Sequence, residues 1–174
     1  MNLLGSKTIL RAIEPQDSEM LMNLINDPET EYHVGGWSFP VSTKGQREWI
    51  ENLQNDKSEM RCVITDKENK KSVGTIILNN IDYKNGSAQI HIKIASEVHR
   101  GKGYGSDAVS TVVTYGFNEL RLHCIYANVN EDNLASVKLF SKCGFEHDGL
   151  LRDRIFKRGK YLNVKTLSII NAYR

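Results

Sequence analysis

The chain has 174 residues, of which 40% are hydrophobic and 25% charged, and its formal net charge is +2. This composition is typical of one folded domain with a sizeable core. The weak net charge gives no reason to expect binding to nucleic acid or to an anionic membrane, and no apolar run approaches the roughly 18 residues that span a bilayer.

The chain opens with a strand and a helix. Residues 7–13 alternate polar and apolar side chains, which predicts a strand. Pro15 suits the first turn of a helix, and the spacing of the apolar residues that follow predicts a helix over 17–26. The sequence Asn-Asp-Pro, ending at Pro28, is expected to stop that helix.

A loop and a second helix follow. The aromatic-containing sequence ETEYHVGGWSFPVS is expected to form a loop after the first helix. Ser42 or Thr43 can cap the next helix, which extends to about residue 53. Its apolar spacing predicts that Trp49 and Ile50 face inward.

Strands and helices alternate through the rest of the chain. Short β-rich runs separated by polar turns and glycines predict the remaining elements. These are strands at 60–65, 73–78 and 88–94, a helix at 103–118, a strand at 122–129, a helix at 133–142 and a closing hairpin of 145–154 with 161–171.

The pattern predicts one mixed α/β domain over residues 1–174, because no repeat, low-complexity tract or linker interrupts it. The three cysteines, Cys62, Cys124 and Cys143, are far apart and form no CxxC pair, so we expect a reduced, cytoplasmic protein without a metal site. The N-terminal sequence MNLLGSKTIL is too short and interrupted for a signal peptide.

The sequence VHRGKGYGSDAV, residues 98–109, lies between a predicted strand and a predicted helix. A glycine-rich turn at a helix N-terminus exposes backbone N–H groups at the positive end of the helix dipole, which favours phosphate. Gly101, Gly103 and Gly105 allow the backbone to approach oxygen atoms closely. Arg100 and Lys102 add positive charge.

Two common phosphate-binding motifs do not fit this stretch. A P-loop requires Ser or Thr after its lysine, but Lys102 is followed by Gly103. The dinucleotide fingerprint GxGxxG fails because Asp107 and Ala108 stand where its last glycine would be sought. The pattern Arg/Gln-x-x-Gly-x-Gly/Ala is satisfied.

With this loop, the chain resembles the GNAT superfamily of acyl-CoA-dependent N-acyltransferases, and within it the RimJ/RimL-like branch. The opening TILRAIEPQDSEMLMNLINDPE, the loop EVHRGKGYGSDAV and the closing NEDNLASVKLFSKCGFEHDGLLRDRIFKRGKYLNVKTLSI carry the resemblance over nearly the whole chain. It implies an α/β fold with a mixed sheet of about six to seven strands, splayed in the middle, and about four helices.

The resemblance also implies a site for acetyl-CoA between the strands at 88–94 and 122–129. Backbone N–H groups of the loop would bind the pyrophosphate, backbone groups of the preceding strand would pair with the pantetheine, and the helix after the second strand would contact it. The implied cofactor-binding residues are Ile92, Ile94, Arg100, Gly101, Lys102, Gly103, Tyr104, Gly105, Ser106, Asn133, Ser136 and Phe140.

Two groups commonly used by the family for proton transfer are replaced here. Phe140 stands where many members have a tyrosine that protonates the leaving thiolate, and Gln89 stands where relatives often have a glutamate. His91 shares a strand face with Gln89 and could act as the base. Cys143 is a candidate acid, three residues after Phe140, and water is the alternative.

The first two helices of the family wall the acceptor site. Residues 1–60 carry ten acidic and five basic side chains, whereas residues 61–174 carry eleven acidic and eighteen basic ones. We therefore expect a cationic acceptor on the acidic side, either a small molecule such as a polyamine or aminoglycoside, or a protein N-terminus. The candidate acceptor-binding residues are Glu29, Glu31, Tyr32, His33 and Trp37, with His33 a weaker candidate base.

The expected function is acetyl transfer from acetyl-CoA to a primary amine by a monomer or homodimer that binds neither nucleic acid nor a membrane. The alternative is a non-catalytic acyl-CoA-binding regulatory domain on the same fold, which would bind CoA without turnover. A third class, nucleic-acid binding through the basic hairpin at 152–160, is not supported, because no aromatic-basic motif accompanies these charges and the net charge is low.

Overall fold

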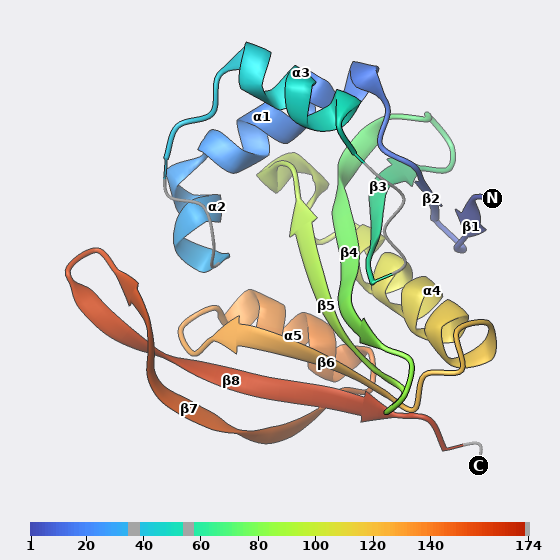
Figure 1. Cartoon of the computed structure of the whole chain (residues 1–174), viewed down its shortest axis with the longest axis vertical. Helices are drawn as coiled ribbons and strands as arrows, with labels where there is room; N and C mark the ends of the chain where they lie inside the picture. Colours follow the sequence, from blue (N-terminus) through green and yellow to red (C-terminus); the bar gives the residue numbers. More distant parts are fainter. Residues whose placement is uncertain (35–38, 54–57, 173–174) are drawn as a thin grey trace.

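The computed structural model describes residues 1–34, 39–53 and 58–172. Eight strands form one mixed sheet in the order β1-β2-β3-β4-β5-β6-β8-β7 (Figure 1). The strands are β1 (Leu3–Leu4), β2 (Thr8–Arg11), β3 (Met60–Asp66), β4 (Ser72–Asp82), β5 (Ser87–Ile94), β6 (Cys124–Asn130), β7 (Glu146–Lys157) and β8 (Lys160–Ile170).

Five α-helices and two short 3₁₀ turns connect these strands within the described residues. The helices are α1 (Ser18–Asn26), α2 (Pro28–His33), α3 (Thr43–Glu51), α4 (Tyr104–Asn118) and α5 (Leu134–Lys142), and the 3₁₀ turns are η1 (Pro15–Asp17) and η2 (Glu97–His99). The α/β fold predicted from the resemblance is confirmed, with one or two more strands and one more helix than expected.

The middle of the sheet is splayed, as predicted. The neighbours β5 and β6 are parallel and pair only through residues 87–89 of β5, although β5 continues to Ile94. Figure 1 shows the two strands side by side at one end and diverging toward the other. The edge of β5 beyond Gln89 is therefore left without a strand on the β6 side.

The two faces of β5 have different roles because successive side chains of a strand alternate between faces. Ala88 and Ile90 are buried in a core cluster with Val109 and Val112 of α4. Burying one such aliphatic side chain contributes about 1.5–3 kcal/mol. Gln89, His91 and Lys93 consequently lie on the opposite face of the strand.

This opposite face is covered by the first helices. The register places Arg61 of β3, Ile77 of β4 and His91 of β5 in one row. The guanidinium of Arg61 lies 5.9 Å from the ring centroid of Trp49 in α3. Trp49 is 41% exposed, so the prediction that it faces inward was wrong, because its ring lies over a charged strand residue instead of entering the core.

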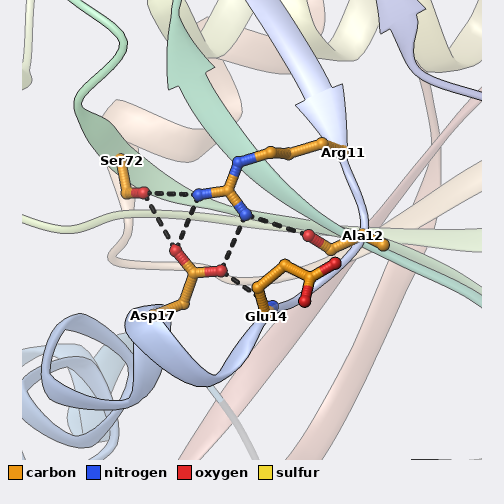
Figure 2. Close-up of polar contacts among 5 residues, drawn as sticks. All are labelled: Arg11, Ala12, Glu14, Asp17 and Ser72. Atoms are coloured by element: carbon orange, nitrogen blue, oxygen red, sulfur yellow. Dashed lines mark hydrogen bonds and ion pairs between the residues drawn. The ribbon is translucent and has the colours of Figure 1, made fainter.

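A nearly buried ion pair fixes the start of the helical layer (Figure 2). Arg11, at the end of β2, donates two hydrogen bonds of 2.7 Å to the carboxylate of Asp17, which is 2% exposed. Ser72 of β4 donates to the same carboxylate at 3.0 Å, and the N–H of Glu14 donates at 2.9 Å. Burial opposes the charge of Asp17, but these hydrogen bonds outweigh it and lower its pKa.

The segment after α1 differs from the prediction. Residues 28–33 form the helix α2, not a loop. Asp27 caps it by accepting a hydrogen bond from the N–H of Thr30 at 2.7 Å, and Pro28 occupies the first turn. The Asp-Pro pair therefore ends one helix and begins the next, since both residues are favoured at a helix start.

Candidate functional site

The glycine loop adopts a backbone that favours glycine at two positions. Gly101 has a φ of 74° and Gly103, which precedes the first turn of α4, has a φ of 88°. Both values lie in the left-handed region, where a Cβ causes strain. The first N–H groups of a helix have no carbonyl partner within it, so the turn presents donors at the positive end of the 15-residue helix α4.

Asp107 attaches this helix end to the N-terminal strands. Its carboxylate accepts hydrogen bonds from the N–H and Oγ of Ser6, the N–H of Lys7, and the N–H and Oγ1 of Thr8, at 2.6–3.0 Å. Burial alone would raise the pKa of Asp107, but the hydrogen bonds lower it to about 2. Lys7 also donates from Nζ to the carbonyl of Lys102 at 3.0 Å, directly in the loop.

A pocket of about 370 Å³ opens beside the loop. It lies among α2, β5, the loop, the first turn of α4 and α5. Among the residues predicted to bind the cofactor, those that line it are Ile92, Ile94, Arg100, Gly101, Gly103, Tyr104, Gly105, Ser106, Asn133 and Ser136. Residues of β5, the glycine loop and α5 that the resemblance assigned to one site therefore do line one pocket.

The N-terminus of α5 contributes an amide to the pocket. Asn133 caps this helix, since its Oδ1 accepts a hydrogen bond from the N–H of Ser136 at 3.1 Å. The cap uses the acceptor of the side-chain amide and leaves the Nδ2 donors for a ligand. Asn133 is thus a helix cap that also lines the pocket, and its Nδ2 group can donate a hydrogen bond to a bound molecule.

Two predicted residues lie elsewhere. Phe140 is 3% exposed, does not line the pocket, and packs against Phe145 with ring centroids 5.0 Å apart. Lys102 is exposed and also does not line the pocket. Its carbonyl, as noted, accepts from Lys7, so its backbone supports the loop.

Cys143, the candidate acid, lies at the C-terminal end of α5. Its thiol donates a weak hydrogen bond to the carbonyl of Ser106 in α4, with a sulfur–oxygen distance of 3.7 Å. Burial raises the pKa of this thiol, so it stays protonated at neutral pH. Cys143 does not line the pocket.

His91, the candidate base, is half-buried on the helix-covered face of β5. Burial lowers its pKa, and the positive charges of Lys93 and Arg61 lower it further. The imidazole is consequently neutral at pH 7 and able to accept a proton. Gln89, two residues earlier on the same face, accepts a hydrogen bond from Nδ2 of Asn80 at 3.2 Å.

The acidic residues expected to bind a cationic acceptor are paired within the chain. Glu29 forms an ion pair of 2.6 Å with Arg158, and Glu31 is paired with the buried Lys157. Lys157 is the last residue of β7 and Arg158 follows it in the turn of the β7–β8 hairpin, which reaches the side of α2 (Figure 1). Part of the acidic charge in the N-terminal third therefore pairs with basic charge in the C-terminal third, in a contact between α2 and this hairpin.

Tyr32 belongs to the same contact. Its hydroxyl donates to Asp132 at 2.6 Å, its carbonyl accepts from Nδ2 of Asn130 at 2.9 Å, and the guanidinium of Arg158 lies 4.5 Å from its ring centroid. Of the remaining candidates, His33 lines the pocket together with Glu29. Trp37 lies outside the described residues.

Two features were missed by the sequence reasoning. The role of Asp107 depends on residues about 100 positions earlier, and the chain has no local signal for that contact. Nδ1 of His33 is buried and has no hydrogen-bond partner among the described residues, although it belongs to a pocket-lining side chain.

Within the described residues, no group of three or more His, Cys, Asp or Glu could hold a metal ion. A search of the same residues found no helix with the length and apolar character needed to cross a membrane.

Comparison with known proteins identifies this arrangement. The model of the acetyltransferase (GNAT) domain matches residues 7–146. Spermidine N(1)-acetyltransferase of Vibrio cholerae is 32% identical over 171 residues, which cover 97% of this chain and 96% of that protein. The putative ribosomal N-acetyltransferase YdaF of Bacillus subtilis is 28% identical over 167 residues, covering 92% and 90%.

A solved structure agrees with these relatives. The crystal structure of spermidine N-acetyltransferase from Vibrio cholerae in complex with CoA and spermine has a TM-score of 0.83 at 30% identity, covering 95% of this chain and 96% of that one. The chain therefore belongs to the GNAT family and is an acetyl-CoA-dependent N-acetyltransferase.

Proposed function

We propose that the enzyme transfers the acetyl group of acetyl-CoA to a primary amine of a small molecule. The observation that carries this proposal is the pocket itself, which is lined by the loop with its donor groups and by Ile92, Lys93 and Ile94 of β5. His91 does not itself line the pocket but directly precedes Ile92 on β5, so a thioester bound along the open edge of this strand would lie close to it.

In this proposal the loop at 100–106 binds the pyrophosphate with its N–H groups, and Arg100 and Lys142 add positive charge. The pantetheine arm pairs with the backbone of Ile92 and Ile94 like an added strand. Asn133 donates from Nδ2 to an amide oxygen of the arm. The core face of β5 is filled by α4, so the acceptor approaches from the polar face.

The reaction forms a C–N bond and breaks the C–S bond of the thioester. An amine with a pKa near 10.4 is neutral in only about one molecule in a thousand at pH 7.4, so removing its proton is part of the barrier. His91 takes this proton, directly or through water. Phe140 has no proton to give, and water protonates the thiolate.

The proposal also specifies the class of acceptor, a small molecule instead of a protein N-terminus. The Vibrio cholerae relative, named for spermidine, favours a small molecule over the protein N-terminus that a RimJ/RimL-like enzyme would acetylate. The internal ion pairs of Glu29 and Glu31 weaken the argument that these two carboxylates bind a cation.

The test is release of CoA thiol from acetyl-CoA with a panel of amines: spermidine, an aminoglycoside, free amino acids, and short peptides with varied N-termini. Turnover with a small-molecule class supports the proposal. Turnover confined to peptides would assign a protein acceptor. Absence of thiol release with every amine, while CoA still raises the melting temperature, would contradict the proposed reaction.

A further inference from the structure

Lys93 is a charged residue for which the described part of the chain supplies no carboxylate partner. It is half-buried on the polar face of β5, between Ile92 and Ile94, and it lines the pocket. Among the side chains that the structure describes, no carboxylate forms an ion pair with it. A half-buried ammonium without a partner loses hydration and gains nothing in return.

The surrounding charges leave this part of the pocket positive. Arg61, a second cation whose charge acts on Lys93, is paired with Glu59 through two hydrogen bonds of 2.6 and 2.7 Å. Burial lowers the pKa of Lys93, and the positive charge of Arg61 lowers it further. Glu29, on the α2 side of the pocket, is paired with Arg158.

The cofactor does not account for Lys93 either. The phosphates of CoA would bind at the loop, where Arg100 and Lys142 also line the pocket. Lys93 instead lies on the stretch of β5 that would pair with the pantetheine, an uncharged arm. Its side chain is on the face from which the acceptor approaches, as His91 is.

We propose that Lys93 binds an anionic group, a carboxylate or a phosphate, carried by the amine acceptor. This inference rests on the proposed function, which it narrows to amines that bear a negative charge near the reacting nitrogen. An ammonium–anion contact in a partly buried pocket is a strong hydrogen bond, and it would orient the amine toward the thioester. A polyamine, which carries only positive charges, would be repelled by Lys93.

Matched pairs of amines test the proposal. Ornithine is putrescine with an added carboxylate, and phosphoethanolamine is ethanolamine with an added phosphate, so each pair isolates the anionic group and the two pairs distinguish its kinds. Affinity is measured by titration calorimetry on protein saturated with CoA, which needs no turnover. The kcat/KM for acetyl transfer is measured with the same compounds.

We expect the anionic member of at least one pair to bind roughly tenfold more tightly or better, the size of one charge-assisted hydrogen bond. Lys93→Met should remove that preference and leave CoA affinity unchanged, whereas Lys93→Arg should keep part of it. Lys165→Met in β8, outside the pocket-lining set, is the matched control and should keep the preference.

The two proposals fail in different ways. Equal or tighter binding of putrescine and ethanolamine by the wild-type protein overturns the role of Lys93, whatever the variants do. A large loss of CoA affinity in Lys93→Met with unchanged acceptor preference would assign Lys93 to the cofactor and also overturns it. Preference for the anionic amines without any acetyl transfer would support the anion site and contradict the proposed reaction.

Discussion

Asp107, in the first turn of α4, accepts hydrogen bonds from both the N–H and the Oγ1 of Thr8 in β2, at 2.9 and 2.7 Å. The same carboxylate binds Ser6 and Lys7, so one side chain joins the edge of the sheet to the helix that begins at the glycine loop. The space is tight, because a Cβ on Gly5 would lie 2.2 Å from Oδ2 of Asp107. The position of the glycine loop thus depends on the N-terminal strands.

Replacing Asp107 by alanine should destabilise the protein and weaken CoA binding together. Hydrogen bonds to a charged group contribute about 1.5–3 kcal/mol each, and several backbone donors would lose their acceptor. We expect a loss of at least about 2 kcal/mol in the free energy of unfolding, measured by urea denaturation. Glu119→Ala, at the exposed C-terminal end of α4, is the control. Unchanged stability in Asp107→Ala would show that the carboxylate is dispensable.

The pKa of Asp107 also predicts a pH dependence of stability. Its folded value is about 2, below the value of about 3.9 for an unfolded aspartate. The charged form is therefore favoured by folding. Its contribution is present above pH 4 and is lost as the pH falls through the folded pKa. Urea midpoints between pH 6 and pH 2.5 should fall less steeply in Asp107→Asn than in the wild type; parallel curves would contradict this.

How well the sequence predicted each feature depended on how local that feature is. The glycine loop is encoded within a few neighbouring residues, and in the structure Gly101 and Gly103 have the positive φ that favours glycine. The helix α2 was missed because the Asp27-Pro28 pair is favoured at a helix start as well as at a helix end. The pairs of Glu29 and Glu31 join residues 129 and 126 positions apart, and local patterns contain no such information.

Gly103→Ala should weaken CoA binding through the backbone of the loop. A Cβ at φ 88° costs about 1–2 kcal/mol, and it would lie 3.2 Å from Nζ of Lys7. Gly159→Ala is the matched control, since Gly159 has a φ of 81° in the β7–β8 turn with nothing nearby. Both variants should unfold more easily, but only Gly103→Ala should bind CoA more weakly by calorimetry. Equal CoA affinities of Gly103→Ala and Gly159→Ala would show that the loop does not bind the cofactor.

The two ion pairs between α2 and the β7–β8 hairpin should contribute differently to stability, because one is largely buried and the other is exposed. Glu31→Gln leaves Lys157, which is 7% exposed, without its acid, and breaking such a pair costs about 3–5 kcal/mol. Glu29→Gln removes an exposed partner of Arg158 and should cost much less stability than Glu31→Gln, because exposed ion pairs contribute little. Thermal and urea unfolding of both variants measure the difference.

Glu29→Gln also tests whether Glu29 binds the acceptor. Because the charge of Glu29 is offset by Arg158, Glu29→Gln should leave the acceptor KM within about twofold of the wild type. A selective rise in this KM for polyamines would instead assign Glu29 to binding of a cation, and would argue against an anionic acceptor at Lys93.

His91→Asn should lower kcat without changing the affinity for CoA. Loss of a general base reduces the rate by about 10²–10⁴-fold. Burial lowers the pKa of His91, with further contributions from Lys93 and Arg61, so the wild-type kcat/KM should fall only below about pH 6.5, where the imidazole becomes charged. That acid limb should disappear in His91→Asn, and Gln89→Ala on the same strand face should retain it. A rate loss with an unchanged pH profile would mean that His91 only positions its neighbours and that water carries the proton alone.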